Sequence, residues 1–259
     1  MKSIEKNREF LKNVSQYVQI EDLRSDQQRG VPPPPLQKPV PKDAEVLDLV
    51  PPDKLSIALK PMIDVISGRR SRRSYLEGSL SCEELSFLLW ATQGVRSISK
   101  GSVHTLRTVP SAGARHPFET YLVIDRVEGI RPGLYRYLPL THGLLFVSDT
   151  GSEFKNGLID GTFGQEFVGG AALVFIWTVI PYRSEWRYLG RAHKVIALDA
   201  GHVCQNLYLA SEAIGAGACA IAAYDQEKMD ALLGVDGTEE FTIYLAPVGK
   251  VRQKETARS

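Results

Sequence analysis

Hydrophobic runs and regularly spaced apolar residues divide the chain after residue 60 into strands and helices. Residues 118–125 and 171–179 have the length of strands and are rich in β-branched and aromatic side chains. The second run has no polar face, which predicts a core strand at the centre of a sheet covered on both sides. Similar patterns predict a β-hairpin from residues 133–138 and 144–147, a short strand at 219–223 and a last strand at 239–248.

Helical spacing predicts a short helix at residues 62–66, ended by Ser67 and Gly68, and a longer helix that begins at Ser81. Glu84 lies three residues after Ser81, so the two form a capping box. The expected buried stripe of this helix is Leu85, Leu88, Leu89 and Thr92, and Gly94 ends it.

The longest helical pattern runs from residue 185 to residue 214 and is apolar or small on both of its sides. This predicts a buried helix, and its small residues hint at a close helix contact in the core of a dimer. Asp225 is expected to cap one more helix, at residues 226–233.

The N-terminal residues 1–60 differ in composition from residues 61–259, so we treat them as a separate unit. Residues 4–20 have the spacing of an amphipathic helix or of an extension that lies over another surface. The prolines between residues 30 and 52 exclude both helix and central strand, which predicts an extended arm. Such an arm is either a loose linker or a segment that wraps a partner subunit.

Composition and charge exclude several classes of protein. The 259 residues are 43% hydrophobic and carry a net charge of +1, so the chain has no field that would hold a nucleic acid. There is no run of eighteen apolar residues and no signal peptide, so we expect a cytoplasmic protein without a membrane contact. Three distant cysteines read as reduced, buried thiols, and the histidine spacing predicts no metal site.

Four arginines in five residues, Arg69, Arg70, Arg72 and Arg73, follow the short helix at 62–66. Guanidinium groups stay charged and fit phosphate oxygens, so a phosphate is their natural partner. A solvated charge run is the alternative. The stretch 109–117 combines small residues with a proline near each end, which predicts either a loop that approaches a flat ligand or an ordinary surface loop.

Six motifs in a fixed order resemble the nitroreductase superfamily of FMN-dependent oxidoreductases, and within it the SagB-type dehydrogenase branch. In chain order they are Arg-Arg-Ser-x-Arg from Arg69, Pro-Ser-Ala-Gly-x-x-x-Pro from Pro110, Gly-Leu-Tyr-x-Tyr from Gly133, Asp199-Ala-Gly-His-x-x-Gln-Asn206, Ile214 to Asp225, and the closing Val-Gly-Lys-x-Arg from Val248. The resemblance spans residues 61–252. It implies an α+β fold with a central, mostly antiparallel sheet flanked by helices, in an intertwined homodimer that binds FMN at the subunit interface.

The resemblance also implies roles for individual residues. Arg69, Arg70, Ser71 and Arg73 would contact the FMN phosphate and ribityl chain, and Lys250 and Arg252 would close on the same phosphate. The ring-binding loop would be Pro110, Ser111, Ala112 and Gly113, followed by Ala114, and the backbone against flavin N5 would be Ala222 and Ala223. Many relatives carry Gly-Gly or Glu-Gly in place of those two alanines.

Arg187 and Tyr188 occupy the place of a Lys-Tyr pair that azoline-oxidising members of the branch use for proton transfer. Arginine cannot act as a base, although it can hold a carbonyl or a carboxylate. The leading hypothesis is therefore an oxidoreductase that transfers hydride through flavin N5 to or from a small organic substrate, with NAD(P)H as an electron donor.

Three alternatives stay open. The first is an azoline-to-azole dehydrogenase that acts on a modified peptide. The second is a flavin-binding protein without turnover, suggested by Arg187 and the Ala222-Ala223 pair. The third is a basic-patch binder that holds no flavin.

Overall fold

The computed structural model describes residues 8, 10–11 and 24–252. The helix expected within residues 4–20 therefore lies largely outside the described residues. No helix in the described part of the chain is both long and apolar enough to cross a membrane.

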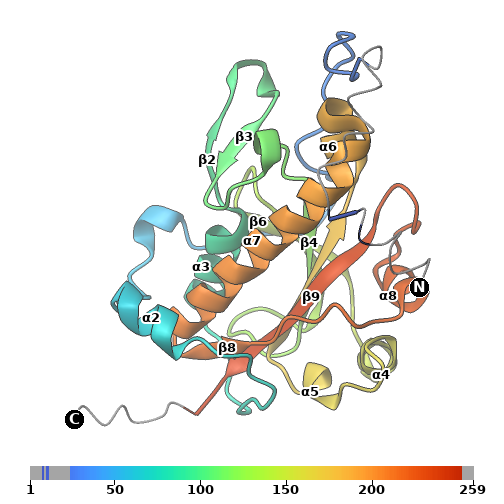
Figure 1. Ribbon diagram of the computed structural model, residues 1–259. Helices are drawn as coiled ribbons and strands as arrows, with labels where there is room; N and C mark the ends of the chain where they lie inside the picture. The colour runs from blue at the N-terminus through green and yellow to red at the C-terminus, as the bar shows by residue number, and fades with distance from the viewer. Residues whose placement is uncertain (1–7, 9, 12–23, 253–259) are drawn as a thin grey trace.

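A seven-stranded antiparallel sheet forms the centre of the molecule, in the order β1-β6-β5-β4-β7-β9-β8 (Figure 1). Its strands are β1 (Val46–Asp48), β4 (Phe118–Ile124), β5 (Gly133–Leu138), β6 (Gly143–Ser148), β7 (Leu173–Val179), β8 (Ala216–Ala218) and β9 (Phe241–Lys250). Every residue of β4 and β7 is buried, so the predicted core strand lies at the centre of the sheet. A separate hairpin pairs β2 (Val95–Ile98) with β3 (Thr105–Arg107).

Alternate residues of the central strands pack into two cores, as the two-residue period of a strand requires. Leu122 and Phe175 belong to the core shared with α3 and α7, whereas Val123 and Ile176 belong to the core shared with α4, α5 and α8. The helices are α2 (Met62–Gly68), α3 (Cys82–Gln93), α4 (Ser152–Gly161), α5 (Glu166–Gly169), α6 (Tyr182–Tyr188), α7 (Ala192–Ala213) and α8 (Gln226–Leu233). The fold is α+β, as the sequence predicts.

The capping box at Ser81 is present, because the Ser81 hydroxyl accepts from the N–H of Glu84 and the Glu84 carboxylate accepts from the N–H of Ser81. Leu85, Leu88, Leu89 and Thr92 are buried on α3, and Gly94 follows its last turn. Asp225 caps α8 through the N–H of Lys228. These local predictions are confirmed.

The long helix expected at residues 185–214 is two helices, α6 and α7, separated by a single turn of 3-10 helix at Leu189–Arg191. The break is at Leu189, whose φ of 52° is incompatible with a continuous helix. The helix is also not buried all round within one chain, since Leu198 is 54% exposed and Gly201 faces open space.

Two further predictions differ in position. The short strand expected at residues 219–223 is β8 at Ala216–Ala218, because pairing with β9 rather than local hydrophobicity sets its place. Beyond it, Ile221 alone forms an isolated bridge to Leu245. Cys204 and Cys219 are buried free thiols, but Cys82 is half-buried at the start of α3.

The proline-rich arm lies against its own chain. Residues 24–45 have no helix or strand, and their backbone reaches α6, β4 and β5 through hydrogen bonds. The arm is therefore not a loose linker in this structure.

Candidate functional site

The arginine turn follows α2 directly and packs against α7 and β8. The Arg69 guanidinium lies 5.4 Å from the centre of the Tyr208 ring, and the hydroxyls of Ser71 and Tyr208 are 2.9 Å apart. Ser71 also bridges to Ala218, where the N–H of Arg72 donates to the Ala218 carbonyl at 2.9 Å. The turn is thus fixed to the outer edge of the sheet.

The C-terminal basic segment reaches the same edge. The carbonyl of Lys250, the last residue of β9, accepts from the N–H of Leu76 at 2.8 Å. The Lys250 ammonium is engaged by the carboxylate of Glu84, whereas Arg252 is exposed. The structure therefore brings together two segments that lie far apart in the sequence, although one of their cations already has a partner.

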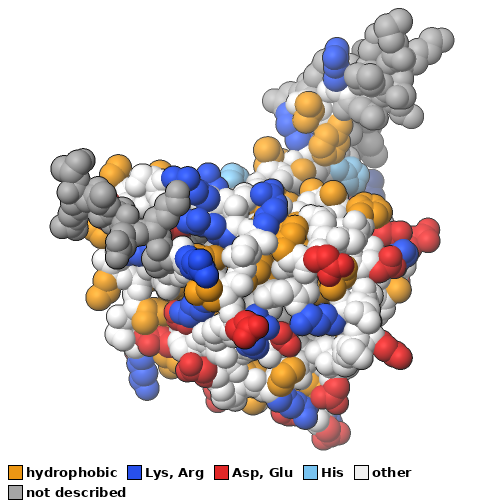
Figure 2. Space-filling view, turned by 90° about the horizontal axis from the view of Figure 1, so that it is seen from below, with side chains coloured by type: hydrophobic (Ala, Val, Ile, Leu, Met, Phe, Trp, Pro, Cys, Tyr) orange, Lys and Arg blue, Asp and Glu red, His pale blue; other side chains and the backbone are white. Residues whose placement is uncertain are grey.

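The remaining cations of this edge have no counter-charge within the part of the chain that the structure describes. Among the described residues, Arg69, Arg70, Arg73 and Arg252 form no ion pair. Figure 2 views the molecule from the side on which Figure 1 places β8, and it shows Lys and Arg side chains gathered on that face. Like charges that are held together and are not themselves paired with a described carboxylate favour the binding of an anion.

Close packing and free donors accompany the arginines. A Cβ on Gly217 would lie 2.4 Å from Cγ of Arg72, so only glycine allows the turn to lie this close to β8. Further along the same edge Ala222 and Ala223 are exposed, and no residue in the described part of the chain accepts from their N–H groups. Burial raises the pKa of the Cys219 thiol, and the adjacent Arg73 guanidinium opposes this rise.

The small-residue loop at Pro110–Ala114 forms a second cluster at the other end of α7. The Ser111 hydroxyl donates to Oδ2 of Asp199 at 2.6 Å, and the N–H of Ala112 donates to the same atom at 3.0 Å. Burial raises the pKa of Asp199, although these bonds and His202 act in the opposite direction. The carboxylate holds the loop and leaves the N–H of Gly113 without an acceptor among the described residues.

Arg187 and Tyr188 lie against this loop. A Cβ on Gly113 would be 2.5 Å from the Tyr188 hydroxyl oxygen and 3.0 Å from Nε of Arg187. The exposed Arg187 guanidinium lies 5.5 Å from the centre of the Tyr188 ring. Gly113 has a φ of 57°, so its lack of a side chain serves both the turn and the contact.

The two clusters contact opposite faces of α7. Asp199 holds the loop and Tyr208 holds the arginine turn, and these residues are nine positions apart. Nine residues of an α-helix correspond to about 180° of rotation and about 14 Å of rise. One chain therefore does not present both clusters to the same side of the helix.

Sequence reasoning misses the residues that hold the two clusters. Tyr208 joins Ser71 to the N–H of Ala220, which donates to its hydroxyl at 2.8 Å, yet in sequence it reads as one more residue on the helix. Asp199 gives a usable signal, because a carboxylate within an apolar helix needs hydrogen-bond donors when it is buried. No cluster of three or more metal-ligand side chains occurs in the part of the chain that is described.

Comparison with known proteins places this geometry in context. The model of the Nitroreductase family matches residues 66–250. A Methanocaldococcus jannaschii protein named as a nitroreductase is 32% identical over 187 residues, which cover 72% of this chain and 89% of that protein. Trifolitoxin-processing protein TfxB of Rhizobium leguminosarum is 30% identical over 138 residues, 51% of this chain and 36% of that longer protein. A crystal structure named as a nitroreductase from Ralstonia eutropha superimposes with a TM-score of 0.64 at 26% identity, covering 86% of this chain and 100% of its own.

Proposed function

Since this chain belongs to the Nitroreductase family of oxidoreductases, we propose that it is an FMN-dependent enzyme that acts on a small organic substrate. When bound, FMN supplies hydride transfer at its N5 atom, with NAD(P)H as the donor. The observation that carries the proposal is the group of arginines beside β8, which have no counter-charge among the described residues and lie near free N–H groups.

The residues present fit FMN in charge and in the hydrogen-bond donors that they offer. Arg69, Arg70, Arg73 and Arg252 would hold the phosphate, and the Ser71 hydroxyl would donate to it or to the ribityl chain. Lys250 would contribute only by exchanging its bond to Glu84 for one to the phosphate. Each charge-assisted hydrogen bond contributes about 1.5 to 3 kcal/mol, so a few of them are sufficient to fix a dianion.

The exposed N–H groups of Ala222 and Ala223 would donate to the polar edge of the flavin ring. The loop Pro110–Gly113 would lie against the ring, with the Gly113 N–H as a donor. Arg187 would orient an anionic or carbonyl group of the substrate, because its charge is permanent and it lies at the exposed side of the loop.

The positions of the two clusters support a homodimer as part of this proposal. Because they face opposite sides of α7, a flavin on the arginine turn of one protomer would meet the Pro110–Gly113 loop of a second copy. The exposed Leu198 and Gly201 on α7 offer an apolar face for that second copy.

A complementation experiment tests this arrangement. Arg70→Ala damages the phosphate cluster and Gly113→Ala damages the loop, so each homodimer should bind FMN at least tenfold more weakly at both of its sites. A doubly tagged heterodimer of the two variants should regain one FMN per dimer at wild-type affinity, since one site then combines an intact turn with an intact loop. A heterodimer without FMN would refute the shared site.

The phosphate assignment has its own test. Arg70→Ala and Arg252→Ala should each weaken FMN binding by about 10- to 150-fold, which corresponds to the loss of one charge-assisted bond. The matched control is Arg131→Ala, which is also an exposed arginine but pairs with Glu45 near β6 and should keep wild-type affinity. If both cluster variants bind FMN as the control does, the phosphate lies elsewhere.

A second candidate function is azoline-to-azole oxidation on a modified peptide, supported by the similarity to a trifolitoxin-processing protein. Arg187 weighs against it, because a guanidinium does not take up a proton from a substrate carbon. Incubation with an azoline-bearing peptide decides between the two, and Arg187→Lys should raise the azole yield if peptide oxidation is the activity. A third candidate is a flavin-binding protein without turnover, which would bind FMN but fail to reduce a nitroaromatic acceptor with NADPH.

A further inference from the structure

The proline-rich arm is attached to the rest of the chain at two separate anchors. At the first anchor, the N–H of Gln27 donates to the Trp186 carbonyl at 3.0 Å, and the Trp186 indole N–H donates to the Val31 carbonyl at 2.9 Å. The Tyr182 hydroxyl donates to Asp26 at 2.8 Å. All three bonds join the arm to α6.

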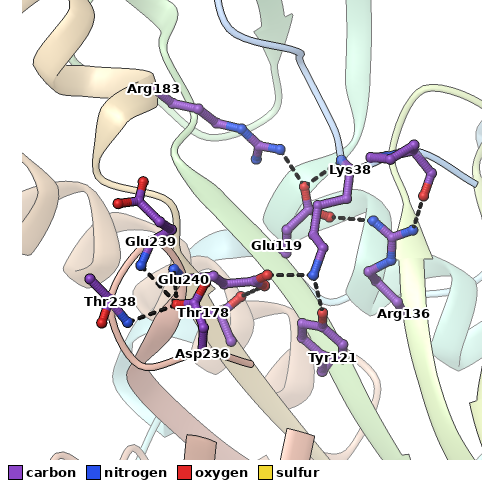
Figure 3. A network of polar contacts seen from close by, with 11 residues as sticks. Lys38, Glu119, Tyr121, Arg136, Thr178, Arg183, Asp236, Thr238, Glu239 and Glu240 are labelled. Carbon is purple, nitrogen blue, oxygen red and sulfur yellow. Dashed lines mark hydrogen bonds and ion pairs between the residues drawn. The ribbon is translucent and has the colours of Figure 1, made fainter. Parts of the chain in front are cut away.

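The second anchor lies at Lys38, whose own hydrogen bonds go to the sheet and to Glu240; α6 meets this anchor only through Glu119, which also accepts from Arg183. The Lys38 N–H donates to Glu119 at 2.8 Å, and its ammonium donates to Tyr121 at 2.9 Å and pairs with Glu240 (Figure 3). Burial lowers the pKa of Lys38, but the bonds to Glu240 and Tyr121 outweigh burial and raise it above its ordinary value. This anchor fastens the arm to β4 and to the start of β9.

The far side of α6 is held by the residue that follows the small-residue loop. The Arg115 side chain donates from Nε to the Arg183 carbonyl at 2.8 Å, and its guanidinium lies 4.7 Å from the centre of the Trp186 ring. Trp186, Arg183 and Arg115 are each 3% exposed. Trp186 therefore lies between the arm and the loop that contacts Tyr188.

The helix has little stability of its own. It contains seven residues, begins after Pro181 and ends at Leu189, whose φ is 52°. Helices shorter than about 12 residues are marginal in water, so external contacts determine where this one lies. The arm supplies such contacts on one side and Arg115 supplies them on the other, and the Arg183 side chain adds an ion pair to Glu119 of β4.

We propose that the first anchor positions α6 against the loop at Pro110–Ala114, with Trp186 as the positioning residue, so that the N-terminal arm sets the placement of Arg187 and Tyr188. The consequence for the substrate rests on the proposed function. The mechanical link between the arm and α6 does not, because it depends only on contacts within the chain.

Hydrogen–deuterium exchange on the full-length protein without added FMN tests the link. The double variant Tyr182→Phe/Trp186→Phe removes two side-chain donors to the arm and keeps an aromatic ring under Arg115. Amides of residues 183–188 should exchange about 5-fold faster or more, since two hydrogen bonds are lost. The matched control is Lys38→Met, which removes the bonds of the Lys38 ammonium to Tyr121 and Glu240, keeps the backbone bond to Glu119 and should leave exchange in α6 at its wild-type rate.

Kinetics with NADPH and a nitroaromatic acceptor distinguish an effect on the placement of Arg187 and Tyr188 from a general loss of structure. The double variant should raise KM for the acceptor about 3- to 10-fold while FMN affinity stays within twofold of wild type. Tyr182→Phe alone should give a smaller change in the same direction. Unchanged exchange in α6, or equal acceleration in the Lys38→Met control, would overturn the proposal. If the double variant shows the expected faster exchange but the wild-type protein has no turnover, the proposed function is refuted and the link between the arm and α6 stands.

Discussion

Glu119 is the carboxylate on which the charged network beneath the arm depends, so its neutralisation should destabilise the fold strongly. It is 2% exposed and accepts from Arg183 at 2.5 Å, from Arg136 at 3.3 Å and from the N–H of Lys38 at 2.8 Å. Glu119→Gln keeps the shape of the side chain, removes its charge and turns one acceptor into a donor that faces a guanidinium (Figure 3).

The magnitude follows from what is left behind. The Arg136 and Arg183 side chains are 4% and 3% exposed, and neither forms an ion pair with another carboxylate in the part of the chain described. Burial and the neighbouring Arg183 already lower the pKa of Arg107 to about 10, and Glu119 opposes that effect. Removing one partner of a buried pair costs about 3 to 5 kcal/mol. At about 2 to 4 °C per kcal/mol for a chain of this size, Tm should fall by roughly 6 to 20 °C.

Urea unfolding and calorimetry measure this cost. The matched control is Glu239→Gln, an exposed glutamate in the turn before β9, which should change the free energy of unfolding by no more than about 0.5 kcal/mol. If the free energy of unfolding of Glu119→Gln lies within about 1 kcal/mol of wild type, the reasoning is refuted, because buried guanidinium groups without a counter-charge should destabilise the fold by more than that.

Three further outcomes are expected. Burial, together with Arg107, lowers the pKa of His116 to about 3, so below pH 6.5 the unfolded chain takes up a proton at this residue while the folded chain keeps it neutral. Urea unfolding should therefore show that His116 lowers the free energy of unfolding by about 2 kcal/mol between pH 7 and pH 5. His116→Asn should remove this part of the pH dependence. Gly113→Ala should weaken FMN binding at least tenfold in a fluorescence titration, because its Cβ would lie 2.5 Å from the Tyr188 hydroxyl. Ser81→Ala should lower the free energy of unfolding by about 0.5 to 2 kcal/mol through loss of the α3 cap, whereas Ser81→Asp should retain most of it.

The elements that the sequence predicts well are those whose pattern has a single physical explanation. A run such as residues 173–179, which is apolar except for Thr178, fits only the centre of a sheet, and Ser81 with Glu84 fits only a helix start. The β2–β3 hairpin escapes because β2 is largely exposed and because β3 buries the polar residues Thr105 and Arg107 and exposes Leu106, the reverse of the usual pattern. The break at Leu189 escapes because apolar spacing continues through it, and only the backbone dihedral angles reveal it.

The candidate site is predictable in its charges and not in its arrangement. The arginine turn can be predicted as an anion site because four like charges in five residues are stable together only in solvent or beside an anion. Ser71 contacts Tyr208, and the loop contacts Asp199 on the opposite face of the same helix. These contacts depend on where each residue lies around the axis of α7, and a sequence motif does not contain that information. The sequence also does not predict the pairing of Lys250 with Glu84, since the capping box of α3 already accounts for Glu84.

The burial of so many arginines has a physical reason in the composition of the arm. Six of the eleven residues from Val31 to Pro41 are prolines, which bring carbonyl acceptors and no N–H donors. A sheet face of apolar side chains would leave those carbonyls unsatisfied on burial, at a cost of about 1 to 3 kcal/mol each. Arg107 donates to the Leu36 carbonyl at 3.2 Å and Arg136 to the Pro39 carbonyl at 2.7 Å, as Trp186 does to Val31. The arm and the buried cations therefore form one unit: the cations supply the donors that the prolines lack, and Glu119 and Glu240 balance part of the charge that this requires.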